Sequence, residues 1–252
     1  MAIPSATGHQ VFPWPNGKRA ALSLTFDDAR LSQIDVGLAI LDAHRVKATF
    51  YVSPGNIEPR LDGWRRAVAS GHEIGNHTLT HPCTINFAFS RNNAVENYTL
   101  ERMDAELAGA NEAIERLLGV TPITFAYPCG QTYVGRGEGV QSYVPLVARR
   151  FLAARTAYCE CHNNPFVCDL AQAHAFEADR KTFAELRPAL DRGLADGAWM
   201  ILFGHEVGAS GHQTVLADTL NTLCQFAQDP TSGLWIGTVA AVASHIAGRR
   251  SG

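Results

Sequence analysis

The residues of this sequence best suited to chemistry are two adjacent carboxylates and three histidines. They are Asp27 and Asp28, then His77 and His81, and finally His205. Two imidazoles four residues apart can converge on one ion from a single short turn, and Asp28 would complete a set of two histidines and one aspartate. Such a set leaves positions open for water or substrate, as metal-dependent hydrolysis requires. Asp27 would point away from Asp28 on an extended chain and could meet the substrate.

Each of these signals has a plainer interpretation when it is taken singly. The aspartate pair precedes a helical pattern and could cap it. A histidine pair in a polar loop is often only solvated. His205 could be a histidine at a strand end whose ring nitrogens are simply hydrogen-bonded. The interpretation changes when they are taken together, because all five residues lie at or just after the ends of predicted strands.

The elements that must position these residues alternate between short apolar runs and amphipathic stretches. Strands are predicted at residues 20–26, 47–52, 72–75, 122–127, 151–156, 173–176, 199–203 and 234–239. Helices are predicted at residues 31–44, 62–70, 98–118, 140–150, 183–194, 215–227 and 239–247, and Gly119 should end the third of them. Residues 82–97 and 130–139 are predicted to be long loops.

Repeated strand-then-helix units without a shift in composition predict one parallel α/β domain, as a barrel or as an open sheet. No G-x-G-x-x-G follows the first strand, which weakens the dinucleotide-binding version. The candidate residues would then share the carboxyl-terminal rim, where α/β barrels place their active sites. We expect a single domain over residues 1–252, with its core at about 17–248.

Composition excludes several classes of function. The 252 residues carry 21 basic and 24 acidic side chains, a net charge of −3 that argues against a nucleic-acid partner. No apolar run reaches the roughly 18–20 residues that cross a bilayer. The amino terminus lacks a secretory signal. We therefore expect an extracellular or periplasmic location if a native precursor carried such a signal, and a cytoplasmic one otherwise. The oligomeric state is not predicted.

Six cysteines are present, and they do not identify the compartment. Cys159, Cys161 and Cys168 cluster with His162, but their spacing is not that of a standard zinc site. We expect buried thiols or a local disulfide there.

From the amino to the carboxyl terminus, the chain contains the motifs "ALSLTFDD", "ATFYV", "GHEIGNHTLTH", "FAYPCG" and "ILFGHEVG". With these motifs the sequence resembles the polysaccharide deacetylases, also called the NodB-homology group or carbohydrate esterase family 4. The resemblance runs from about residue 17 to the end. It implies a distorted (β/α) barrel with seven or eight strands.

The resemblance also implies roles for individual residues. Asp27 would be the catalytic base and His205 the general acid, while Asp28, His77 and His81 would bind a divalent metal. Zinc suits these ligands best, and cobalt, nickel and manganese are also compatible. The backbone N–H of Cys129 would help to hold the oxyanion. The substrate would contact Phe203, in the acetyl pocket, and Tyr127 and Pro128.

Two family features are altered in this chain. The motif R-x-P-Y is replaced here by Ala126-Tyr127-Pro128-Cys129, so the arginine that steadies the catalytic aspartate is missing. Arg155, at the end of the next predicted strand, is our candidate replacement. An Asp-Trp motif has no clean counterpart, and Asp179 is the nearest match.

The reaction implied is metal-dependent removal of acetyl groups from an acetylated carbohydrate. N-Deacetylation of N-acetylglucosamine glycans, such as chitin oligomers or peptidoglycan, is the first choice. Three alternatives remain open: an O-acetyl esterase acting on acetylated xylan, a hydrolase of a non-sugar amide, and an inactive carbohydrate-binding protein.

Overall fold

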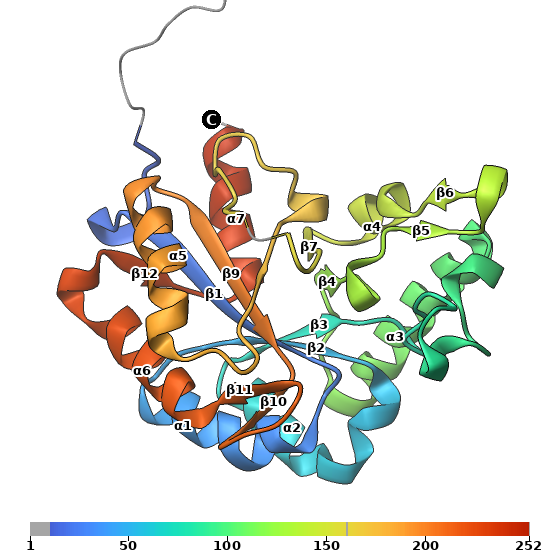
Figure 1. Ribbon diagram of the computed structural model, residues 1–252, viewed down its shortest axis with the longest axis horizontal. Coiled ribbons are helices and arrows are strands. Elements are labelled where there is room, and N and C mark those ends of the chain that lie inside the picture. Colours follow the sequence, from blue (N-terminus) through green and yellow to red (C-terminus); the bar gives the residue numbers. More distant parts are fainter. Residues whose placement is uncertain (1–10, 160, 252) are drawn as a thin grey trace, which may run out of the picture.

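The computed structural model describes residues 11–159 and 161–251 (Figure 1). The strands are β1 (Ala20–Asp27), β2 (Thr49–Val52), β3 (Glu73–Asn76), β4 (Thr124–Ala126), β5 (Tyr133–Val134), β6 (Gln141–Ser142), β7 (Ala153–Arg155), β8 (Phe176–Glu177), β9 (Trp199–Gly204), β10 (Glu206–Gly208), β11 (Thr214–Leu216) and β12 (Leu234–Ile236). The helices are α1 (Leu38–Ala43), α2 (Leu61–Ala69), α3 (Leu100–Leu118), α4 (Val144–Arg150), α5 (Phe183–Ala195), α6 (Ala217–Gln228) and α7 (Val239–Arg250).

The main sheet is parallel and curls until its two edge strands meet. Its order is β7-β4-β3-β2-β1-β9-β8, and β12 pairs with the first residues of β1. The segment that enters β8 closes the sheet, because Ala173 pairs with Arg155 of β7 while Phe176 pairs with Leu202 of β9. The prediction of a distorted (β/α) barrel is therefore confirmed, and the open-sheet alternative is wrong.

Alternation along the central strands separates the interior of the barrel from its helical coat. Met200 and Leu202 of β9 share an apolar cluster with α1, α2, α5 and α6. Trp199, Ile201 and Phe203 belong to a second cluster, which α7 and Trp14 complete. Every residue of β1 and β9 is buried, because these strands are covered on both faces. This rigid pair carries Asp27 and His205 at its ends.

Most predicted elements are present, with shorter ends. Helix α3 begins at Leu100, two residues after the predicted start, because the Thr99 side chain accepts a hydrogen bond from the Arg102 N–H and caps it. Gly119 ends this helix in a left-handed conformation, as expected. The predicted loop at 130–139 was only partly right, since it holds strand β5 of the β5–β6 hairpin.

The helix predicted at 31–44 is present over residues 31–43, but it contains a wider π turn over Gln33–Gly37. This turn carries the fully buried Gln33, whose Nε2 donates to the backbone oxygens of Asp27 and His205. Pi turns inside helices often occur at functional sites. Here the turn joins the ends of β1 and β9.

Within the part of the chain that the structure describes, no helix is both long enough and apolar enough to span a membrane.

Candidate active site and metal centre

Asp28, His77 and His81 come together at the carboxyl-terminal rim of the barrel. Asp28 follows β1 directly and His77 follows β3. The Oδ1 atom of Asp28 lies 3.5 Å from His77 Nε2 and 3.3 Å from His81 Nε2. One ligand atom from each residue lies within 4.8 Å of the other two, so a single ion could contact all three.

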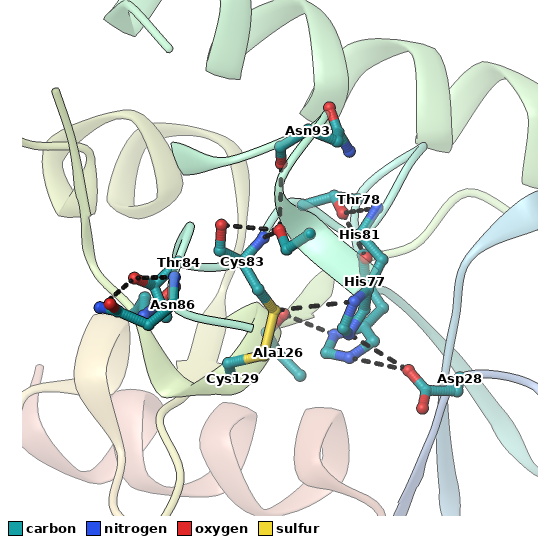
Figure 2. Close-up of a disulfide and its surroundings, with 12 residues drawn as sticks. Asp28, His77, Thr78, His81, Cys83, Thr84, Asn86, Asn93, Ala126 and Cys129 are labelled. Atoms are coloured by element: carbon teal, nitrogen blue, oxygen red, sulfur yellow. Dashed lines mark hydrogen bonds and ion pairs between the residues drawn. A yellow bond between two sulfur atoms is a disulfide. The ribbon is translucent and has the colours of Figure 1, made fainter. Parts of the chain in front are cut away.

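Neighbouring groups orient these side chains so that their remaining ligand atoms face one another. His77 Nδ1 lies 2.8 Å from the Ala126 carbonyl oxygen, which leaves Nε2 free (Figure 2). Arg30 donates to Asp28 Oδ2 at 2.9 Å, which leaves Oδ1 free. Histidine ligands of zinc commonly have such a second hydrogen bond. The donor set therefore fits a divalent ion of the zinc type.

The turn that carries His81 is compact and is not a helix, as predicted. Thr78 and His81 both have positive φ angles, 64° and 52°. Hydrogen bonds stabilise this conformation, because the Thr78 N–H donates to Asn76 Oδ1 and the His81 N–H donates to Thr78 Oγ1. Strained backbone of this kind persists where surrounding contacts enforce it.

A buried carboxylate on α3 anchors the same turn. Glu106 accepts hydrogen bonds from the Thr80 N–H, from Thr80 Oγ1 and from the Tyr98 hydroxyl. Sequence reasoning missed this residue, although a signal was available: Glu106 interrupts the apolar face of α3 beside Met103 and Leu107.

Electrostatics favour the ligand-competent forms of this cluster. Burial raises the pKa of Asp28, but the hydrogen bond from His77 and the charges of His77 and His81 outweigh it, so the pKa lies well below its ordinary value. Burial, together with His77, lowers the pKa of His81 to about 4. At neutral pH the cluster therefore offers a carboxylate and a neutral His81 imidazole.

Arg155 pairs with Asp27 inside the barrel. Its Nη2 contacts Asp27 Oδ1, and its Nε donates to Thr25 Oγ1 at 3.1 Å. The guanidinium carbon lies 5.0 Å from the ring centroid of Tyr51 and 5.0 Å from that of Phe203. The Arg155 side chain is fully buried. The structure thus places our candidate for the missing arginine against the carboxylate that it would steady.

Asp179 pairs with His205 in the same way. Its Oδ2 lies 2.6 Å from His205 Nδ1, and its Oδ1 accepts the His205 backbone N–H. Burial lowers the pKa of His205. The Asp179 hydrogen bond and the negative charges of Asp27, Asp179 and Asp28 raise it by more, so the pKa lies above its ordinary value. The other ring nitrogen, His205 Nε2, lies 3.5 Å from Gln213 Nε2.

One cavity of about 580 Å³ is lined by Asp27, Asp28, His77, His81 and His205, whereas Arg155 and Asp179 lie outside its lining. Of the predicted substrate residues, Phe203 and Tyr127 line it, although the Tyr127 hydroxyl is engaged by the Ala171 carbonyl oxygen. Pro128 is buried and is not among the lining residues. The other lining residues are Arg30, Ser53, Asn56, Phe87, Phe89, Cys129, Ala157, Tyr158, His212 and Gln213.

A disulfide between Cys83 and Cys129 forms part of the wall, and sequence reasoning did not find it. These cysteines are 46 residues apart and meet only because β3 and β4 are neighbours (Figure 2). The bond joins the loop after His81 to the residue predicted to hold the oxyanion.

The expectation for the other cysteine cluster was wrong. Cys159 and Cys161 are exposed and Cys168 is half-buried, and all three are free thiols. The described residues around Cys159 and Cys161 are exposed or half-buried, so the core does not cover these two sulfur atoms.

A comparison with known protein families matches the segment of the chain that carries five of the predicted site residues. The family model described as polysaccharide deacetylase matches residues 15–138, which include Asp27, Asp28, His77, His81 and Cys129. Residues 15–138 belong to the polysaccharide deacetylase family.

Relatives extend this result. A chitooligosaccharide deacetylase from Rhizobium leguminosarum bv. trifolii is 39% identical over 95 residues, covering 36% of this chain and 38% of that protein. A peptidoglycan-N-acetylglucosamine deacetylase from Bacillus cereus is 32% identical over 116 residues, covering 45% of this chain and 38% of the relative. The chain spans well under half the length of the curated relatives that it matches.

A solved structure shows that the polysaccharide deacetylase fold continues beyond residue 138. A putative polysaccharide deacetylase from Mycobacterium smegmatis superposes with a TM-score of 0.69, at 17% identity, and covers 95% of this chain and 94% of its own. Arg155, Asp179 and His205 thus lie in a part of the chain that the family model does not match but the shared fold covers.

We predict that replacing Arg155→Met destabilises the protein by about 3–5 kcal/mol, because it leaves the Asp27 carboxylate buried without its partner. The matched control is Arg150→Met, since Arg150 pairs with the half-exposed Asp104 and surface pairs contribute about 1 kcal/mol or less. Urea unfolding measures both losses. Equal stability of the two variants would contradict the assigned ion pair.

Proposed function

We propose that this protein is a divalent-metal-dependent deacetylase that hydrolyses the N-acetyl group of N-acetylglucosamine units in a glycan. The observation that carries the proposal is the shared cavity. One wall presents Asp28, His77 and His81, and the same space is lined by Asp27 and His205. Ligands, a base and an acid within one cavity are the parts that acetyl hydrolysis needs.

Asp28, His77 and His81 would hold the ion. Zinc is our first choice, with cobalt, nickel and manganese as alternatives, because two imidazoles and one carboxylate suit all of these. When bound, the ion would supply Lewis-acid activation of the acetyl carbonyl and of water.

Asp27 would accept the proton of the attacking water. Arg155 occupies Asp27 Oδ1, which leaves Oδ2 as the accepting oxygen. Thr25 holds Arg155 in turn, and its hydroxyl donates to the Leu202 carbonyl oxygen, which connects the base to β9. Asp27 therefore sits in a fixed position, as general-base catalysis requires.

His205 would protonate the leaving amine through Nε2. Asp179 engages Nδ1, which fixes the ring and stabilises the imidazolium form. The raised pKa of His205 keeps a larger fraction protonated near neutral pH.

The Cys129 backbone N–H would hold the oxyanion. The residue lies in a tight turn with φ 54°, and the disulfide fixes its side chain to Cys83. An amide positioned in advance contributes a few kcal/mol to such transition states.

Aromatic side chains at the rim support a sugar substrate. Phe87 and Phe89 lie parallel with centroids 5.4 Å apart, and Phe89 lies 6.4 Å from His81. Both rings are exposed, at 45% and 69%. Exposed aromatic faces beside a polar site are suited to stack on the apolar face of a pyranose ring. Two relatives are named for chitooligosaccharide and peptidoglycan N-acetylglucosamine deacetylation, which supports the same substrate class.

Acetate release tests the proposal directly. We expect release from chitin oligomers or peptidoglycan fragments, its loss on treatment with a chelator, and recovery with zinc. Asp27→Asn should abolish turnover while metal analysis still finds the ion bound. Release only from acetylated xylan would indicate an O-acetyl esterase, and binding without release would indicate an inactive module. Chelator-insensitive activity would refute the proposed metal dependence.

The pH profile tests the acid. Asp179 raises the pKa of His205, and a general acid fails as the pH rises through its pKa. In Asp179→Asn the falling limb of kcat/KM should therefore move to lower pH. Asp196→Asn is the control, because Asp196 pairs with His162 at 3.9 Å and should leave the profile unchanged. If the falling limb of kcat/KM stays at the same pH in Asp179→Asn, His205 is excluded as the acid.

The aromatic pair should matter for glycans but not for small substrates. We expect Phe87→Ala and Phe89→Ala each to lower kcat/KM for chitin oligomers between about twofold and tenfold, which corresponds to the loss of one aromatic contact. Hydrolysis of a small acetyl ester should not change. Val140→Ala, at a comparably exposed residue that does not line the cavity, is the control. Equal losses on both substrates would argue against stacking.

A further inference from the structure

A second set of metal-ligand atoms lies behind the proposed metal centre. One atom each from His81, Cys83 and Cys129 lies within 4.8 Å of the others. In the structure the two sulfur atoms are joined as a disulfide, and His81 Nδ1 lies 3.8 Å from Cys83 Sγ (Figure 2). Figure 2 shows the imidazole between this sulfur and Asp28.

We propose that reduction of this disulfide creates a thiolate metal site made of Cys83, Cys129 and His81, selective for zinc-like ions. Tetrahedral zinc, with bonds of about 2.3 Å to sulfur and about 2.0 Å to nitrogen, places its ligand atoms about 3.5–3.8 Å apart. The 3.8 Å between His81 Nδ1 and Cys83 Sγ already lies within this range. Two thiolates and one imidazole, with an open fourth position, form a known zinc ligand set.

The backbone holds both cysteines in place independently of the S–S bond. Ser90 Oγ accepts from the Cys83 N–H at 2.9 Å and donates to the Cys83 carbonyl oxygen at 2.8 Å. Cys129 lies in a turn closed by the Gly130 N–H to the Tyr127 carbonyl oxygen. Reduction would therefore leave the two sulfur atoms near each other, and side-chain rotation alone would move them to a metal-binding separation.

A water-soluble phosphine can reduce the disulfide between Cys83 and Cys129 to two thiols. The phosphine takes oxygen from water and becomes a phosphine oxide, while the disulfide gains two electrons and two protons to give two thiols. Cys129 lines the cavity, which gives the reductant a path to the sulfur. Metal binding then releases the thiol protons, because thiolate is the ligand.

His81 belongs to both ligand sets through different nitrogens. Its Nε2 faces Asp28 at 3.3 Å, and its Nδ1 faces the sulfur. A neutral imidazole has one free nitrogen lone pair, so it can serve only one ion at a time. The state of the disulfide would decide which set binds the metal. This last consequence rests on the proposed metal centre, whereas the thiolate site does not.

Cobalt absorption tests the thiolate site without any measurement of activity. The free thiols of the oxidised protein are first alkylated, which blocks the exposed Cys159 and Cys161, and mass measurement counts the modified thiols. The phosphine then reduces the disulfide, is removed, and Co²⁺ is added. We expect strong thiolate-to-cobalt charge-transfer absorption in the reduced sample and its absence in the unreduced one.

Three variants assign the signal. Asp28→Ala should keep the absorption after reduction, because the thiolate site does not use that carboxylate. The double variant Cys83→Ser with Cys129→Ser should lose it, and His81→Ala should weaken it. Reduced protein that binds no cobalt, or binds it without this absorption, overturns the proposal, as does equal absorption in the double variant. Acetate release by the oxidised protein tests the proposed function separately.

Discussion

The buried pairing of Arg155 with Asp27 is the interaction on which the rest of the site depends. A guanidinium inside a barrel loses its hydration, and only a fully satisfied set of partners offsets that cost. Thr25, Asp27 and the carbonyl oxygen of Thr156 supply these partners, and the flanking rings of Tyr51 and Phe203 fill the remaining space. The pair joins β7 to β1 across the barrel.

The loops of the rim are held by a different means, through buried polar contacts and one covalent bond. Glu106 anchors the turn that carries His81, Gln33 joins the ends of β1 and β9, and the disulfide joins Cys83 to Cys129. Apart from the bond between Gln33 and Asp27, which are six residues apart, these contacts cross between segments separated by 26 to 172 residues. A metal site of short side chains needs such support, because a displacement of about an ångström would spoil its geometry.

Much of the fold was predictable because its signals are local. The apolar runs of β1 and β9 and the stripe on α3 were identified from periodicity alone, and Gly119 marks a helix end through its backbone freedom. The π turn at Gln33 and the β5–β6 hairpin were missed. Neither has a clear local signature. One carbonyl oxygen that Gln33 contacts in the π turn belongs to His205, 172 residues away, and the hairpin strands are only two residues each.

The sequence by itself determined which ligand and acid–base types are present, the strand–helix alternation that places them on one rim, and the family of residues 15–138. Only the tertiary structure decided which groups pair: Arg155 with Asp27, Asp179 with His205, and Cys83 with Cys129. The physical reason is that periodicity and spacing report contacts within one element. Closure of the barrel brings together residues more than a hundred positions apart, such as Asp27 and Arg155, and no local pattern records that contact.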